Sequence, residues 1–244
     1  MDKKVIELRN IITNAEKITF LGGAGVSTES GIPDFRSENG IYNTVQMYGN
    51  QPEKILSRTF FYENTELFYD FYRNEIAHEG IQPNSAHYAL AKLEKMGKLI
   101  AVITQNIDGL HQLAGCKKVL DLHGSINRNY CMDCHRSYEV SYILATEGVP
   151  KCVVCGGVVK PDVVLYDEEL NDMVLKRSIE AVSQADVLII GGTSLNVYPA
   201  AGLIQYFKGN ALVLINKSET PYDHKADLLI RGDIGRTLSE AMDS

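Results

Sequence analysis

Four cysteines in the middle of the chain form two closely spaced pairs. Two residues separate Cys131 from Cys134 and Cys152 from Cys155, and 17 residues lie between the pairs. This C-x2-C-x15–20-C-x2-C spacing is typical of a four-thiolate zinc site, whereas a redox-active thiol pair is the alternative. Because four thiolates leave no open coordination position, we predict one structural Zn²⁺ ion.

A glycine-rich run follows a short apolar segment near the N-terminus. Ile18–Leu21 is predicted to be a buried strand, and Gly23 and Gly25 lie just beyond it, where backbone N–H groups could approach a pyrophosphate. A dinucleotide fingerprint would need a small residue at the position of Thr28, and the run continues into Pro33-Asp34-Phe35-Arg36. The run therefore predicts a nucleotide held for chemistry other than hydride transfer.

Polar side chains also follow other predicted strands, at the points where these strands end. They belong to Thr104–His111, His123, Gly191–Ser194 and Asn216. Such groups could simply cap helices or form turns, or they could bind an amide, ribose hydroxyls or phosphate. His123 is a candidate general base because a histidine ordinarily titrates near neutral pH, although a lone histidine is more often structural.

Apolar runs of strand type alternate with helical patterns along much of the chain. The expected strands are Ile18–Leu21, Leu99–Thr104, Val119–Leu122, Val163–Tyr166, Val187–Ile190, Leu212–Ile215 and Leu228–Ile230, and the expected helices include Ser85–Met96, Asn171–Gln184 and Pro199–Phe207. This alternation predicts an α/β fold with a Rossmann-like parallel sheet and helices on both faces. Ligands of such folds bind at the carboxyl ends of the strands, where the polar residues fall.

Two stretches interrupt this alternation. Residues 41–80 are rich in aromatic side chains at helical spacing, which predicts a small helical subdomain with an aromatic core. Residues 126–160 carry the paired cysteines and are predicted to form a zinc-ribbon module. We expect a single catalytic domain over residues 1–244, whose Rossmann-like part comprises about 1–40, 81–125 and 161–244.

Composition limits the possible functions. The 244 residues are 45% hydrophobic and 23% charged, with a formal net charge of -7 and no long basic block, so no direct nucleic acid binding is expected. No apolar run approaches the ~20 residues of a membrane span. The charged N-terminal segment lacks the apolar region of a secretion signal, which predicts a cytoplasmic protein.

Taken together, the motifs resemble the sirtuins, the NAD-dependent protein lysine deacylases. The matching segments are Gly23–Ser27, Gly31–Arg36, Thr104–His111, Leu122–Gly124, both cysteine pairs, Gly192–Leu195, Val197–Pro199 and Ile215–Asn216. Each motif is weak by itself, but the set occurs in the order of the family and extends from about residue 18 to 235. The ordered set is therefore specific.

The resemblance implies roles for individual residues. His123 would be the general base, and Asn106 is expected beside it in the catalytic set. The NAD pocket would be lined by Ala24, Thr28, Phe35, Arg36, Gln105, Ile107, Asp108, His123, Thr193, Ser194, Asn216 and Ile234. Within that pocket, Phe35 would shield the reacting ribose carbon from water, and Ile107 with Asp108 would hold the nicotinamide carboxamide.

The resemblance also implies the reaction and the partner. NAD would be a co-substrate in the removal of acetyl or other neutral acyl groups from protein lysines, with release of nicotinamide and O-acetyl-ADP-ribose. An acylated lysine peptide would bind as an added strand between Val163–Tyr166 and Gly191–Val197, and a monomer is expected. Two alternatives are a protein mono-ADP-ribosyltransferase and a non-catalytic NAD-sensing zinc-ribbon scaffold.

Two residues depart from the family pattern. Asp70 stands where sirtuins that prefer acidic acyl chains usually have tyrosine, in the stretch Asp70–Arg73. We expect its carboxylate to disfavour an acidic acyl group, which is the reason for predicting a neutral chain. Asp167 replaces a frequent glycine in Tyr166–Glu168, which leaves the geometry of the peptide groove open.

Overall fold

The computed structural model describes residues 2–34 and 49–242, and its centre is a six-stranded parallel sheet. In spatial order the strands are β3 (Val119–Asp121), β2 (Leu99–Thr104), β1 (Ile18–Gly22), β7 (Val187–Gly191), β8 (Ala211–Ile215) and β9 (Leu228–Ile230). Phe20 of β1 pairs with Val102 of β2 on one side and with Ile189 of β7 on the other. The strand order reverses between β1 and β7, which is where ligands bind in open α/β sheets.

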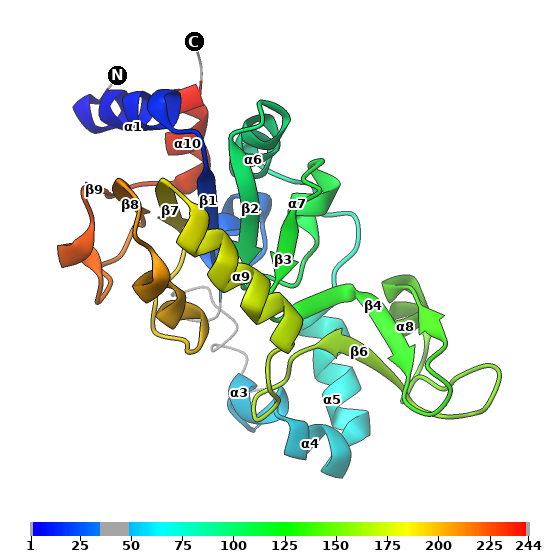
Figure 1. The fold of residues 1–244 in the computed structure, drawn as a ribbon. Coiled ribbons are helices and arrows are strands. Elements are labelled where there is room, and N and C mark those ends of the chain that lie inside the picture. The colour runs from blue at the N-terminus through cyan, green and yellow to red at the C-terminus, as the bar shows by residue number, and fades with distance from the viewer. Residues whose placement is uncertain (1, 35–48, 243–244) are drawn as a thin grey trace.

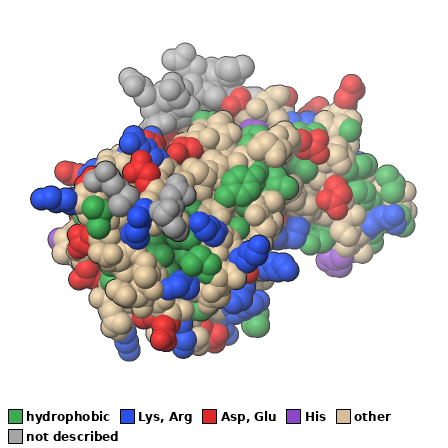
Figure 2. Space-filling view, turned by 90° about the horizontal axis from the view of Figure 1, so that it is seen from above, with side chains coloured by type: hydrophobic (Ala, Val, Ile, Leu, Met, Phe, Trp, Pro, Cys, Tyr) green, Lys and Arg blue, Asp and Glu red, His purple; other side chains and the backbone are tan. Residues whose placement is uncertain are grey.

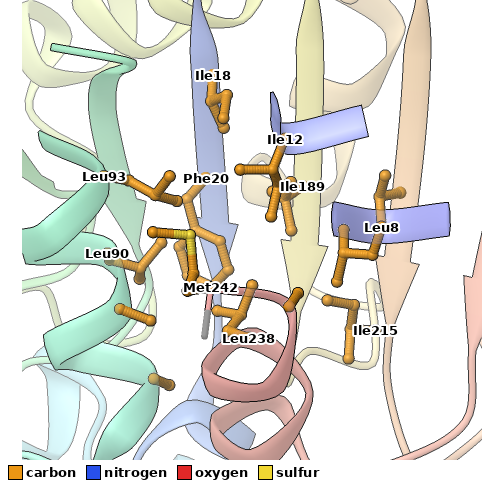
Figure 3. Packing of buried hydrophobic residues seen from close by; sticks show 14 of the residues in the cluster. Leu8, Ile12, Ile18, Phe20, Leu90, Leu93, Ile189, Ile215, Leu238 and Met242 are labelled. Carbon is orange, nitrogen blue, oxygen red and sulfur yellow. The ribbon is translucent and has the colours of Figure 1, made fainter. Parts of the chain in front are cut away.

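Helices cover both faces of this sheet because its strands alternate their side chains between two apolar clusters. Phe20 packs with α1 (Lys3–Asn14), α6 (Ser85–Lys95) and α10 (Ile234–Met242), while the next residue, Leu21, packs with α9 (Asp172–Gln184) and η5 (Ala200–Tyr206). Figure 3 shows the first cluster, with Leu8 and Ile12 of α1, Leu90 and Leu93 of α6, and Leu238 and Met242 of α10 around Phe20 and Ile189. The predicted fold class is confirmed.

Side-chain caps begin three of these helices. Asp2 accepts from Lys4 N–H at the start of α1, and Asn171 accepts from Met173 and Val174 N–H at the start of α9. Asn84 caps α6 in a reciprocal arrangement in which the ring of His87 accepts from the Asn84 N–H group. Each cap satisfies backbone donors that a helix leaves unpaired.

A second sheet is antiparallel and small. Its order is β5 (Ser137–Tyr138), β4 (Gly124–Cys131) and β6 (Val159–Val163), and α8 (Val140–Ala145) follows β5. It lies on the side of the molecule away from the two termini, next to the helical segments of residues 52–76 (Figure 1). The helical segments are α3 (Pro52–Ile55), α4 (Arg58–Glu63), α5 (Thr65–Phe71) and the π-helix η4 (Tyr72–Ile76).

One apolar cluster joins these helices to the small sheet. Phe61, Phe68 and Tyr72 pack in it together with Cys131 and Cys152, and the aromatic residues make edge-on and stacked contacts. The expected aromatic core is therefore present, but Tyr62 is exposed. Because the core is shared, the helices and the small sheet support each other.

The structure corrects two predicted elements. Val163–Tyr166 does not form a strand of the parallel sheet: β6 ends at Val163 in the small sheet, and Tyr166 forms an isolated bridge with Ser57. An apolar run alone does not reveal which sheet it joins. Pro199–Phe207 contains a 3-10 helix, η5, in place of an α-helix.

No helix in the described part of the chain is long and apolar enough to cross a membrane. On the face seen in Figure 2, acidic and basic side chains are interspersed, so that face carries charges of both signs.

Candidate active site

A cavity of about 1110 Å³ lies at the carboxyl ends of the parallel strands, across the reversal point between β1 and β7. Its volume slightly exceeds the ~300–1,000 Å³ of typical small-molecule pockets. The predicted site residues that line it are Ala24, Thr28, Gln105, Asn106, Ile107, Asp108, His123, Thr193, Ser194, Asn216 and Ile234. Phe35 and Arg36 lie outside the described residues.

Two glycine-containing loops meet at the reversal point with their backbones in contact. The Gly25 N–H group donates to the carbonyl oxygen of Gly192 at 2.8 Å. A Cβ atom on Gly25 would lie 2.8 Å from Gly192 Cα, and Gly192 itself has a φ of +62°. These glycines are therefore required for the two loops to approach each other, whether or not they also contact a phosphate.

A network of short hydrogen bonds ties the glycine-rich loop to the loop after β2. Ser27 donates its hydroxyl to the Asp108 carboxylate at 2.6 Å and accepts from the Asn106 side-chain amide at 2.9 Å. The other Asp108 oxygen accepts from the Leu110 N–H group, and the Gln105 side chain donates to Thr193 Oγ1. The loop of residues 105–108 is thus held by the glycine-rich loop and by the loop after β7.

The imidazole of His123 lies between the two sheets, after β3 and just before β4. Its Nδ1 atom is 2.9 Å from the carbonyl oxygen of Gln105. A carbonyl oxygen can only accept, so Nδ1 carries the proton and Nε2 is left with its lone pair. Burial lowers the pKa of His123, against a smaller opposing effect of the Gln105 carbonyl, so the neutral base is the favoured form.

Sequence reasoning missed several residues of the cavity. Ser27 was assigned no role, although its place directly after the glycine-rich run is a usable signal; in the structure it is buried and lines the cavity. His78, in the loop after η4, is half-buried and lines the cavity, where burial lowers its pKa despite the nearby Asp108 carboxylate. Lys217 and Asp233 form an ion pair beside Asn216. No local sequence pattern indicated that His78, Lys217 or Asp233 would line the cavity.

The reason for predicting a neutral acyl chain is wrong. Asp70 is exposed and lines a separate depression together with Arg73, while Glu75 and Ile76 of the following turn line the cavity. The Asp70 side chain points away because α5 buries the aromatic residues on its other face. The preference for a neutral chain remains a prediction without that support.

The second departure, Asp167, does lie at the cavity and has a left-handed backbone conformation, with a φ of 69°. This conformation favours glycine, which explains why a glycine can stand at such a position. In the preceding segment the N–H groups of Val164 and Tyr166 donate to His123 and Leu56 oxygens. A peptide strand added here would have to use the remaining main-chain groups.

The four paired cysteines converge at one end of the small sheet. Their Sγ atoms all lie within 4.8 Å of one another, with 3.3 Å between Cys131 and Cys155 and 3.5 Å between Cys134 and Cys152. A tetrahedral zinc ion with Zn–S bonds of about 2.3 Å needs sulfurs about 3.8 Å apart. The donor set fits one structural zinc ion, and all four thiols are free of disulfides.

Two histidines are buried behind the loop after β2. His87 of α6 and His111 of α7 (Leu110–Leu113) have ring centroids 4.6 Å apart, and both side chains are at most 1% exposed. Burial lowers the pKa of His87 to about 4 and that of His111 to about 3. Both rings are therefore neutral. His87 is thus a packed residue of helix α6.

Comparison with known proteins places this site in a family. The family model described as "Sir2 family" matches residues 23–199, which include the glycine-rich loop, His123 and all four paired cysteines. The chain belongs to the Sir2 family.

Relatives within the Sir2 family are similar over the whole chain. A protein of Clostridium acetobutylicum named "NAD-dependent protein deacetylase" is 59% identical over 236 residues, which is 96% of each chain. A protein of Clostridium perfringens with the same name is 58% identical over 244 residues and 100% of both chains.

Solved Sir2 structures have the same fold. A complex described as Sir2 with a p53 peptide and NAD⁺ matches with a TM-score of 0.86 at 37% identity, covering 99% of this chain and 98% of that one. A Sir2 variant with a deacetylated p53 peptide and 3′-O-acetyl ADP-ribose matches with a TM-score of 0.88 at 39% identity, over 97% and 96% of the two chains.

Proposed function

We propose that this protein is an NAD-dependent protein lysine deacetylase. The observation that carries the proposal is the cavity at the strand reversal, which gathers a neutral histidine base and the Gln105–Asp108 loop in a chain of the Sir2 family. Relatives with the same length are named as such deacetylases. In this reaction acetyl-lysine, NAD and water give lysine, nicotinamide and O-acetyl-ADP-ribose.

Each part of the cavity has a proposed task. The loops at Ala24–Thr28 and Thr193–Ser194 hold the phosphates and the adenosine half of NAD, with Asn216 and Ile234 beside the adenosine. Gln105 and Asn106 contact the ribose, and Ile107 with Asp108 hold the carboxamide. Because the Asp108 carboxylate already accepts hydrogen bonds from the Ser27 hydroxyl and the Leu110 N–H group, its position is set before NAD binds.

His123 acts after nicotinamide has left. The acetyl oxygen of the substrate displaces nicotinamide at the anomeric carbon of the ribose, which forms an imidate. His123 Nε2 then accepts a proton from a ribose hydroxyl, and this hydroxyl attacks the imidate carbon. Outside the described residues, we propose that Phe35 and Arg36 complete the pocket above the ribose.

We also propose a cytoplasmic monomer with an acylated lysine peptide as its partner and no direct nucleic acid binding. The whole chain forms one catalytic domain, with the helical insertion at 41–80 and the zinc module at 126–160. The shared core of Phe68 and Cys152 supports the treatment of these parts as one unit. Acetyl or another neutral acyl group is the group that we propose is removed from lysine.

The test is incubation of the protein with NAD and an acetyl-lysine peptide, followed by mass spectrometry. We expect nicotinamide, deacetylated peptide and O-acetyl-ADP-ribose in equal amounts. His123→Ala should lower the rate by about 10²–10⁴-fold, the usual contribution of a general base, while NAD binding persists.

Other products would contradict the proposal. ADP-ribose attached to protein, formed equally well by His123→Ala, would indicate a mono-ADP-ribosyltransferase. NAD binding without release of nicotinamide from any acylated peptide would indicate a non-catalytic NAD sensor.

A further inference from the structure

A tyrosine hydroxyl lies directly against one of the candidate zinc ligands. Tyr138 donates its O–H group to the Sγ atom of Cys152 at 3.1 Å and accepts from the Val153 N–H group at 2.9 Å. Tyr138 belongs to β5, the strand that follows the first cysteine pair, whereas Cys152 opens the second pair. The hydroxyl thus links the strand that follows the first cysteine pair to the second cysteine pair.

The ring that carries this hydroxyl is held in place. Tyr138 pairs with Asn129 of β4, and the Asn129 side-chain amide donates to the Tyr138 carbonyl oxygen at 3.3 Å. The ring also packs against Tyr142 of α8, with centroids 4.6 Å apart. Strand pairing and this tilted ring contact therefore orient the Tyr138 hydroxyl toward the sulfur.

Cys152 is one of the two buried cysteines of the cluster. It is 3% exposed and Cys131 is fully buried, whereas Cys134 and Cys155 are exposed. Its sulfur also accepts a hydrogen bond from the Val154 N–H group at 3.4 Å. A buried thiolate is deprived of hydrogen bonds from water, so donors from the protein must stabilise its negative charge.

We propose that Tyr138 is a positioning residue of the zinc site, whose hydroxyl stabilises and orients the Cys152 thiolate and so slows loss of the ion. The proposal rests on the four-thiolate zinc site inferred above. Groups that hydrogen-bond to metal ligands typically contribute 10–100-fold to metal affinity. The contact matters beyond the zinc site because Cys152 shares its core with Phe68 and Tyr72 of the helical segments.

The experiment compares zinc release from purified wild-type protein, Tyr138→Phe and Tyr130→Phe. Each protein is first analysed for metal, and about one zinc per chain is expected; wild-type protein without zinc would refute the four-thiolate site itself. A chelating dye in excess then reports the rate of zinc release. Tyr138→Phe should release zinc about tenfold faster or more. Tyr130→Phe, with a partly exposed ring on the neighbouring strand β4, should match wild type.

Cobalt substitution separates a direct effect on the thiolate from a loosened fold. Loss of a hydrogen bond raises the energy of the sulfur lone pair, so the thiolate-to-cobalt charge-transfer band of Tyr138→Phe should shift to longer wavelength. The band of Tyr130→Phe should not move. Unchanged release from Tyr138→Phe, or faster release with an unmoved band, would overturn the proposal.

Discussion

At the scale of single residues, the Gln105 carbonyl decides how His123 can act. It fixes the proton on Nδ1, so Nε2 is the atom that can accept a proton, and burial keeps the ring neutral. A histidine whose pKa lies below its ordinary value of about 6.5 remains a base in mildly acidic solution. Enzyme activity should therefore fall as His123 becomes protonated.

The corresponding prediction concerns the acidic limb of the pH profile. We expect kcat/KM for NAD-dependent deacetylation to stay high at pH 6.5 and to decline only below it, as His123 becomes protonated. The measurement is kcat/KM against pH with a saturating second substrate. A half-maximal rate at pH 7 or above would contradict the assignment of His123 as a buried general base.

At the scale of secondary-structure elements, the buried histidine pair joins α6 to α7. His87 also caps α6 through Asn84, and the Asn84 side chain donates to the Val26 carbonyl in the glycine-rich loop. His111 follows Asp108 by three residues. The pair therefore lies between the two loops that border the cavity, and its neutral state is part of the packing.

This pairing predicts that acid destabilises the fold. The unfolded chain protonates both histidines near pH 6.5, whereas the folded pKa values are about 4 for His87 and about 3 for His111. Between these values the unfolded state binds more protons, so the free energy of unfolding falls as the pH falls from about 6.5 towards 4. Each histidine contributes a slope of up to about 1.4 kcal/mol per pH unit.

Urea unfolding at several pH values between 7 and 4.5 tests this prediction. His111→Phe should flatten the slope by about one proton, because the phenyl ring can pack against Phe20 without titrating. The matched control is His224→Phe at an exposed position, which should keep the wild-type slope. Equal slopes for His111→Phe and wild type would show that His111 titrates alike in both states.

At the scale of the whole molecule, the zinc site supports the cavity through a shared core. Cys131 and Cys152 pack in the cluster that also contains Ile126, Val163 and Leu165, and these last three residues line the cavity. A structural metal ion contributes its binding free energy to folding. Loss of zinc should therefore disturb the packing of the residues that line the active-site cavity.

Removal of zinc should lower the unfolding temperature by roughly 5–10 °C and reduce NAD-dependent deacetylation, and added zinc should restore both. The measurement is a thermal scan and an activity assay of the same chelated and reconstituted samples. Cys134→Ser, at an exposed ligand, should behave like the chelated protein. Lost activity at an unchanged unfolding temperature would instead indicate a catalytic zinc ion.

Local patterns of the sequence were sufficient for much of this protein. The spacing of Cys131, Cys134, Cys152 and Cys155 indicated the metal site, because two closely spaced thiols can reach one ion wherever the pair lies in a fold. The apolar runs at Ile18 and Val187 identified central strands, because a parallel sheet buries both of its faces. Polar residues after these strands marked the edge at which the cavity lies.

Only the tertiary structure decided which of these segments meet. It joined Ser27 to Asp108, paired His87 with His111, brought His78 to the cavity and turned Asp70 away from it. The periodicity of apolar residues and the spacing of motif residues involve residues that are close together in the chain, so they can be read directly from the sequence. Contacts across dozens of residues depend on how loops close and which faces are buried together, and such long-range packing leaves no local pattern to read.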